Sequence, residues 1–190
     1  MLRDLVLRNR SVRRFRESER IAREALLELV DLARCSASGA NFQPLKYLLS
    51  ADPEGNRRIF PHLRWAGYLE DWPGPKEGER PAAYIVILGD RSVREQFGCD
   101  HGIAAQTILL GAAERGWNGC MIGSIDRPAL QRELALADRF EILLVLALGR
   151  AAETVVLEPL DEKGSIRYWR DEQGVHHVPK RSLDDIVLGP

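Results

Sequence analysis

FEILLVLALGR, residues 140–150, is the most strand-like run in the chain. An uninterrupted apolar run of this length indicates a strand that is buried on both faces. A second run of the same kind, AAYIVILGD at 82–90, ends in Gly-Asp, which is typical of a turn. Both runs are therefore predicted to be strands.

Shorter segments around these two runs predict the remaining elements. LKYLLSA at 45–51 and NGCMIGS at 118–124 indicate short strands, and GIAAQTILLGAAE at 102–114 indicates a core helix because nearly every residue is small or apolar. Further helices are predicted at 2–8, 21–33, 127–136 and 180–188.

The segments between these elements carry the signals of loops and turns. CSASGANFQP at 35–44 is small and polar and predicts a loop that Pro44 closes. Residues 61–81 are rich in Pro, Gly and aromatic residues, and predict a long excursion with at most one helical turn. IRYWRDEQGVHHVP at 166–179 predicts a hairpin closed by DEQG. Helices and strands do not alternate regularly, which favours an α+β fold in one domain over 1–190.

The distribution of charge bears on the class of ligand. The formal net charge is -1, which argues against a nucleic-acid binder, yet RNRSVRRF at 8–15 gathers four arginines and a serine without an acid. Guanidinium and hydroxyl donors suit a phosphate, although such a cluster is also typical of a solvated helix end. Any anion site is therefore expected to be local.

Cysteine usage and hydropathy bear on location. Three cysteines, with no C-x-x-C pair, argue against a disulfide framework and for a reducing compartment. No run is long enough for a signal peptide or a membrane span, so we expect a soluble, cytoplasmic protein without membrane contact.

Common catalytic and metal-binding patterns are missing from the sequence. There is no G-x-G-x-x-G after a strand, no P-loop and no H-E-x-x-H. Cys99-Asp100-His101 lacks further ligands at metal-site spacing, so we expect a buried thiol and a helix-start aspartate, and no metal. His176 and His177 are predicted to lie on opposite faces of a strand, where they cannot chelate together.

Four motifs in order resemble those of the FMN-dependent nitroreductase family. The first two are NRSVRRF at 9–15, against the family's R-R-S-x-R-x-F, and SASGANFQP at 36–44, against S-P-S-x-x-N-x-Q-P. The others are GCDHGIAAQTILLGAAERGWNGCMIGSID at 98–126 and VPKRSLDDI at 178–186. The resemblance implies a nitroreductase-like sandwich, with a central mixed, mostly antiparallel sheet flanked by helices. It also implies an intertwined homodimer with two FMN sites at the interface.

The resemblance also implies which residues bind FMN. The basic motif that contacts the phosphate, ribityl chain and pyrimidine edge corresponds to Arg10, Ser11 and Arg13. The loop that reaches the flavin from the neighbouring subunit corresponds to Ser36, Ala37, Ser38 and Asn41. The turn whose backbone faces flavin N5 and O4 corresponds to Gly123 and Ser124. The C-terminal basic pair corresponds to Lys180 and Arg181.

Three positions depart from the family pattern. Asn9 stands where the first arginine is usual, so one contact is either lost or taken over by Arg8. Ala37 replaces the loop proline. Lys180 and Arg181 are adjacent rather than spaced as K-x-R, which leaves open which of them reaches the phosphate.

The implied activity is ping-pong electron transfer from NADH or NADPH through FMN to a nitroaromatic, quinone or similar small planar acceptor. FMN carries the chemistry, so no catalytic side chain is expected. Trp65, Tyr68 and Trp72 could stack on the substrate, or equally cover the core or the dimer interface. The alternative function is an FMN-binding sensor or storage protein without turnover. An arginine-rich nucleic-acid binder is a third hypothesis, which no RNP-like pattern supports.

Overall fold

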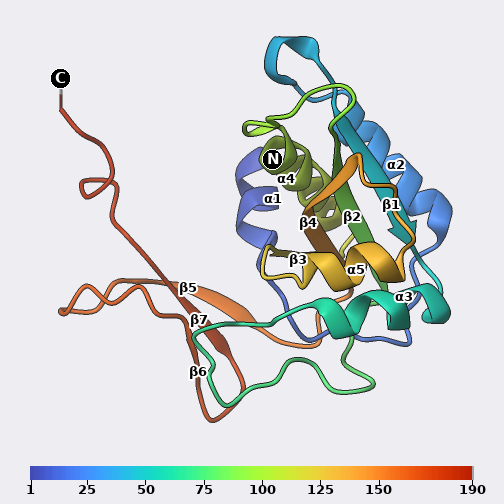
Figure 1. Cartoon of the computed structure of the whole chain (residues 1–190). Helices are drawn as coiled ribbons and strands as arrows, with labels where there is room; N and C mark the ends of the chain where they lie inside the picture. The colour runs from blue at the N-terminus through green and yellow to red at the C-terminus, as the bar shows by residue number, and fades with distance from the viewer. Residues whose placement is uncertain (190) are drawn as a thin grey trace.

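The computed structural model describes residues 1–189, so Pro190 lies outside the described residues. Its centre is a four-stranded sheet, antiparallel throughout, in the order β1-β2-β4-β3 (Figure 1). The strands are β1 (Leu45–Ser50), β2 (Ala83–Asp90), β3 (Asn118–Ile122) and β4 (Phe140–Gly149). The two strands that were predicted from continuous apolar runs, β2 and β4, are the two inner ones.

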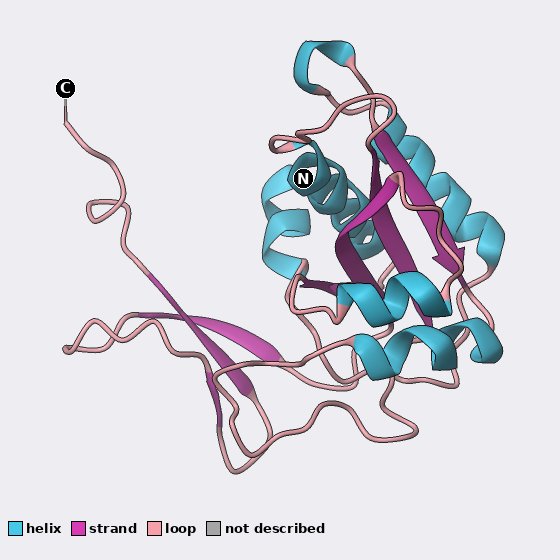
Figure 2. Cartoon of the chain, viewed as in Figure 1, coloured by secondary structure: helices cyan, strands magenta, loops and turns pink. Residues whose placement is uncertain are grey.

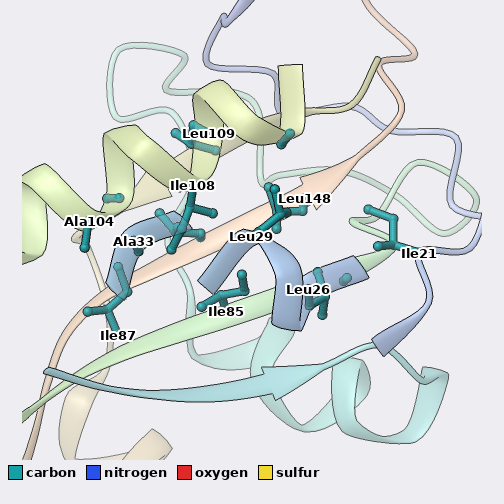
Figure 3. Close-up of a cluster of buried hydrophobic side chains, with 14 of the residues drawn as sticks. Ile21, Leu26, Leu29, Ala33, Ile85, Ile87, Ala104, Ile108, Leu109 and Leu148 are labelled. Carbon is teal, nitrogen blue, oxygen red and sulfur yellow. The ribbon is translucent and has the colours of Figure 1, made fainter. Parts of the chain in front are cut away.

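Both faces of the sheet are covered, which explains the continuous apolar runs. Every residue of β2 is buried. One face packs on the cluster that Figure 3 shows, where Leu29 of one helix meets Ile108 of another over Ile85. The opposite face packs on a second cluster that includes Phe15, Ile59 and Leu130. The predicted α+β sandwich is confirmed.

The helices form the two outer layers (Figure 2). The first layer contains α2 (Arg23–Arg34) and α4 (Asp100–Glu114), and α1 (Leu2–Arg8) lies against α4. The second layer contains α3 (Pro53–Ile59) and α5 (Arg127–Glu133). Sequence reasoning missed α3, although Asp52 followed by Pro53 is a helix-start pattern. The Asp52 carboxylate accepts from the N–H of Gly55 at 2.8 Å.

A second, small sheet lies after β4. It contains β5 (Val155–Pro159), β6 (Trp169–Arg170) and β7 (His176–Lys180). The hairpin predicted at 166–179 is present as β6 and β7, while the parallel pairing of β5 with β7 was not predicted. In Figure 1 this sheet stands beside the main body, and the chain beyond β7 runs away from it.

The helix predicted at 180–188 was wrong. Residues 183–186 form a bend and a turn, in which the N–H groups of Ile186 and Val187 both donate to the carbonyl of Leu183. Leu183 and Leu188 are exposed, at 73% and 90%. A short helix depends on packing for its stability, and the apolar side chains of this segment stay exposed within residues 1–189.

The Cys99-Asp100-His101 segment also differs in part from expectation. Asp100 begins α4 as predicted, but Cys99 is exposed rather than buried. Residues 1–189 contain no group of three or more His, Cys, Asp or Glu side chains that could hold a metal ion. No helix in the same range is long and apolar enough to cross a bilayer.

Candidate functional site

The N-terminal basic motif lies along β3. The Arg10 N–H donates to Asn118 Oδ1 at 3.3 Å, and the Val12 N–H donates to the Gly119 carbonyl at 3.1 Å. A Cβ at Gly119 would lie 2.7 Å from the carbonyl oxygen of Ala147, so glycine is needed where the strands approach this closely. The hydrogen bonds to Asn118 and Gly119 therefore determine where the motif lies along β3.

Arg10 carries an unused donor. Its Nη2 donates to the carbonyl of Val6 at the end of α1, but its Nε is buried and has no acceptor within residues 1–189. Burial lowers the pKa of the guanidinium. A buried donor without an acceptor is unfavourable, so an acceptor that is not part of the single chain would stabilise Arg10. The Ser11 side chain is exposed and, in the described part of the chain, also has no partner.

Arg13 is held more firmly than Arg10. Its Nη1 donates to the Ser11 carbonyl and lies 3.2 Å from Nε2 of His176, and its guanidinium lies 4.9 Å from the centre of the Tyr168 ring. Among the described residues no carboxylate pairs with this guanidinium. Its charge is therefore available to an anion.

The turn after β3 offers free backbone donors. Gly123 and Ser124 are exposed, and the Arg64 N–H donates to the Ser124 carbonyl at 2.9 Å. Within 1–189 the N–H groups of Gly123 and Ser124 have no protein acceptor. Gly123 lies four residues beyond Gly119, just past the end of β3, which is about 13 Å at strand spacing. The cationic donors thus lie alongside the strand, and the free N–H groups follow its end.

The 35–44 loop uses its serines to hold its own shape. Ser36 Oγ bonds to Thr107 Oγ1 at 2.9 Å, and Ser38 Oγ donates to Asp100 at 2.6 Å. Ala40 and Asn41 have positive φ values of 46° and 57°, so the backbone is tightly turned. Asn41 is exposed, and its side-chain amide has no partner in the described residues.

A single chain does not bring this loop to the basic motif. No hydrogen bond or ion pair among residues 1–189 joins residues 36–41 to Arg10, Ser11 or Arg13. A cavity of about 180 Å³ lies beside the loop and is lined by Ser36, Ala37, Ser38 and Tyr47 among others. Within the described residues the motif and the loop are therefore not joined by any polar contact.

Lys180 and Arg181 lie at the far end of β7. Lys180 pairs with Pro159 in the small sheet, and both basic residues are exposed along a groove of about 690 Å³. Lys180 is four residues beyond His176, or about 13 Å along the strand, which carries it away from Arg13. The described residues contain no contact between this pair and the N-terminal motif.

The three aromatic residues of the excursion lie in different surroundings. Trp65 is 8% exposed and packs in the core beside Phe60. Tyr68 is 40% exposed and packs against Tyr168 with the two rings tilted, at 4.8 Å between ring centres. Trp72 packs between the guanidinium groups of Arg14 and Arg170, with Arg170 the nearer at 4.7 Å.

Comparison with known proteins assigns the chain to a family. Residues 6–150 match the model of the Nitroreductase family. The chain belongs to the nitroreductase family. A relative from Bacillus subtilis, named "Putative NAD(P)H nitroreductase MhqN", is 21% identical over 178 residues, covering 77% of this chain and 86% of that protein.

Solved structures of nitroreductase-like proteins share the fold. A "putative NAD(P)H:FMN oxidoreductase" from Staphylococcus epidermidis matches with a TM-score of 0.73 at 16% identity, covering 100% of this chain and 96% of that one. A "putative nitroreductase in complex with FMN" from Exiguobacterium sibiricum matches with a TM-score of 0.66 at 17% identity, covering 80% and 89%. These matches confirm the nitroreductase-like fold that the four motifs indicated.

Two residues that sequence reasoning missed lie after the family match, in the small sheet and the segment leading to it. Glu153 accepts from the N–H groups of Arg13 and Arg14 and from Nη2 of Arg170, and its side chain is 2% exposed. His176 was expected only as a strand residue, and it contacts Arg13. No local pattern marks Glu153, because the N–H groups of Arg13 and Arg14 that it accepts from lie 140 and 139 residues away.

Proposed function

We propose that this nitroreductase-family chain is an FMN-dependent oxidoreductase, which transfers electrons from NADH or NADPH through FMN to a nitroaromatic, quinone or similar planar acceptor. The observation that carries the proposal is the pair of free donor sets along β3. Arg10, Ser11 and Arg13 belong to a segment that runs alongside β3 at Gly119, with Arg13 further along it than Arg10, and the unpaired N–H groups of Gly123 and Ser124 follow the end of that strand. An elongated ligand with an anionic end and a hydrogen-bonding ring fits that arrangement.

The residues fit FMN as follows. Arg10 and Ser11 would bind the phosphate and ribityl end, since guanidinium and hydroxyl groups suit phosphate oxygens. The Gly123 and Ser124 N–H groups would orient the ring without adding a competing acid, and the side chain missing at Gly123 leaves room for it. When bound, FMN supplies the ring that accepts and then donates hydride in two separate half-reactions. The FMN-bound structure from Exiguobacterium sibiricum and the NAD(P)H in the name of the Bacillus subtilis relative support this assignment.

We propose further that the site is completed in a homodimer. The 36–41 loop is separate from the basic motif within one chain, so a partner subunit's loop would supply Ser36, Ala37, Ser38 and Asn41. Because their hydroxyls are already bonded, the serines would act mainly through the loop backbone, whereas Asn41 offers a free amide. Lys180 or Arg181, on the projecting chain, would close on a phosphate.

Of the three aromatic residues that could contact the electron acceptor, the surroundings favour Tyr68 and Trp72. Tyr68 and Trp72 would stack on a planar substrate, whereas Trp65 would support them from the core. Three free cysteines support a reducing, cytoplasmic setting for a single domain of this kind.

The visible spectrum of the purified protein tests the proposal. We expect yellow protein that releases FMN on heating and is bleached by NADH or NADPH without air, then recoloured by a quinone or nitroaromatic. Tight FMN that neither nicotinamide reduces would favour the sensor or storage alternative. Protein that stays colourless after incubation with FMN would overturn the proposal.

A further inference from the structure

Apart from the Ser11 carbonyl, the groups that hold Arg13 come from the chain after the family match at 6–150. The buried carboxylate of Glu153 accepts from the Arg13 N–H, which fixes the backbone. The Tyr168 ring lies under the guanidinium, and His176 contacts it from β7. Residues beyond the matched range 6–150 therefore position a residue of the N-terminal motif.

Only one direction is possible for the hydrogen bond between Arg13 and His176. A guanidinium only donates hydrogen bonds, so Nε2 of His176, 3.2 Å from Arg13 Nη1, must be the acceptor. The imidazole is then neutral and carries its hydrogen on Nδ1. His176 is fully buried, so it holds a single position.

This arrangement is unfavourable for stability by itself. The Nδ1 of His176 is buried and has no partner in residues 1–189, and a buried donor without an acceptor is unfavourable. A phenylalanine of similar shape would avoid that loss. The histidine is better explained by what its other nitrogen does for Arg13.

The charges around His176 keep it in the accepting form. Arg13 and Arg170 face it from the basic motif and β6, Glu153 faces it from the segment before β5, and His177 follows it on β7. Burial, followed by the positive charge of Arg13, lowers the pKa of His176 to about 4. The ring is therefore neutral at physiological pH.

We propose that His176 is a positioning residue, which accepts from one nitrogen of Arg13 and so directs the rest of that guanidinium toward the pyrimidine edge of the flavin. The proposal rests on the proposed FMN site. A guanidinium at that edge stabilises the negative charge of reduced flavin. Loss of the alignment should therefore weaken the binding of reduced FMN more than that of oxidised FMN.

The midpoint potential of FMN in the intact protein tests this inference with matched variants. His176→Phe keeps the ring shape and removes the acceptor, and His176→Gln restores an acceptor. His177→Gln is the control, since His177 lies on the opposite face of the same strand between Glu158 and Asp171. We expect His176→Phe to weaken reduced FMN tenfold relative to oxidised FMN, a fall of about 30 mV for a two-electron couple.

The other variants separate positioning from a structural role. His176→Gln should recover most of the potential, and His177→Gln should match the wild type. An unchanged potential in His176→Phe would overturn the inference. If that variant does not fold, His176→Asn, whose amide is too short to reach Arg13, takes its place.

A measurement without FMN distinguishes failure of this inference from failure of the proposed function. In the apoprotein, ¹⁵N NMR of the imidazole should show an unprotonated Nε2, and Arg13→Ala should raise the pKa of His176. If Arg13→Ala leaves that titration unchanged, the contact is absent and the inference fails, whatever the protein does with flavin.

Discussion

At the scale of single residues, Arg10 shows how one side chain links a helix end to a ligand site. It caps the carbonyl of Val6 with one nitrogen and leaves another buried and unpaired. We predict that Arg10→Ala weakens FMN binding by about 1.5–3 kcal/mol, the range for hydrogen bonds to charged groups. Fluorescence titration of the apoprotein measures this loss.

Arg3→Ala is the matched control for Arg10→Ala. Arg3 is exposed on α1, the helix whose Val6 carbonyl Arg10 contacts. The Arg3 side chain makes no hydrogen bond among the described residues, so its removal should leave the affinity for FMN unchanged. Full FMN occupancy of Arg10→Ala in dilute solution would show that the assigned contact is wrong.

His176 gives the folded state a dependence on pH. Its pKa is about 4 in the folded protein against 6.5 ordinarily, so the unfolded chain binds more protons between these values. The free energy of unfolding should therefore fall as pH decreases from 6.5 to 4, by up to about 3 kcal/mol for this group. Urea unfolding of wild type and His176→Gln at pH 7 and pH 4.5 measures the difference.

The comparison with His176→Gln is needed because other groups titrate in the same range. Hydrogen bonds to Asp171 and Glu158 raise the pKa of His177, so its contribution to stability has the opposite dependence on pH. Parallel pH profiles in the two proteins would contradict the prediction for His176.

At the scale of elements, β3 positions both ends of the site and depends on one glycine. A Cβ at Gly119 would meet the Ala147 carbonyl at 2.7 Å and a methyl of Leu109 at 2.6 Å. We predict that Gly119→Ala lowers the free energy of unfolding by about 1–3 kcal/mol, as overpacking does elsewhere. Chemical denaturation checks the value.

Gly102→Ala provides the contrast. Gly102 lies in the first turn of α4, and an added Cβ there has no neighbour within 4 Å. This change should be neutral or stabilising by up to about 1 kcal/mol, because alanine favours helix. Equal destabilisation by both changes would show that crowding at β3 is not the cause.

The elements that the sequence predicted well share one property. β2, β4 and α4 are apolar on nearly every residue, so burial alone determines their type and place. The segment 180–188 also has helical spacing, but its apolar side chains stay exposed within residues 1–189. Periodicity predicts a helix only where something covers its apolar face.

At the scale of the whole molecule, the chain beyond β7 leaves the body with apolar side chains exposed, Leu183, Ile186 and Leu188 among them. We predict that these residues pack on a second copy, giving a mass of twice 21.4 kDa in solution. The double variant Leu183→Asp, Ile186→Asp should be monomeric and lose its flavin. Light scattering and the visible spectrum report the two outcomes.

Asp184→Asn, in the same segment, should keep both the dimer and the flavin because it leaves the apolar residues in place. A double variant that stays dimeric would contradict the role of this segment. A monomer that keeps FMN fully bound would contradict the shared site.

The sequence by itself determined the buried strands, the core helices, the α+β class and the order of the four motifs, because these depend on local apolar patterns and short spacings. It also predicted that His176 and His177 face opposite ways, which the structure confirms. Only the tertiary structure decided what surrounds Arg13. Glu153 and His176 lie 140 and 163 residues from it, and no local pattern encodes contacts that depend on how two sheets come together.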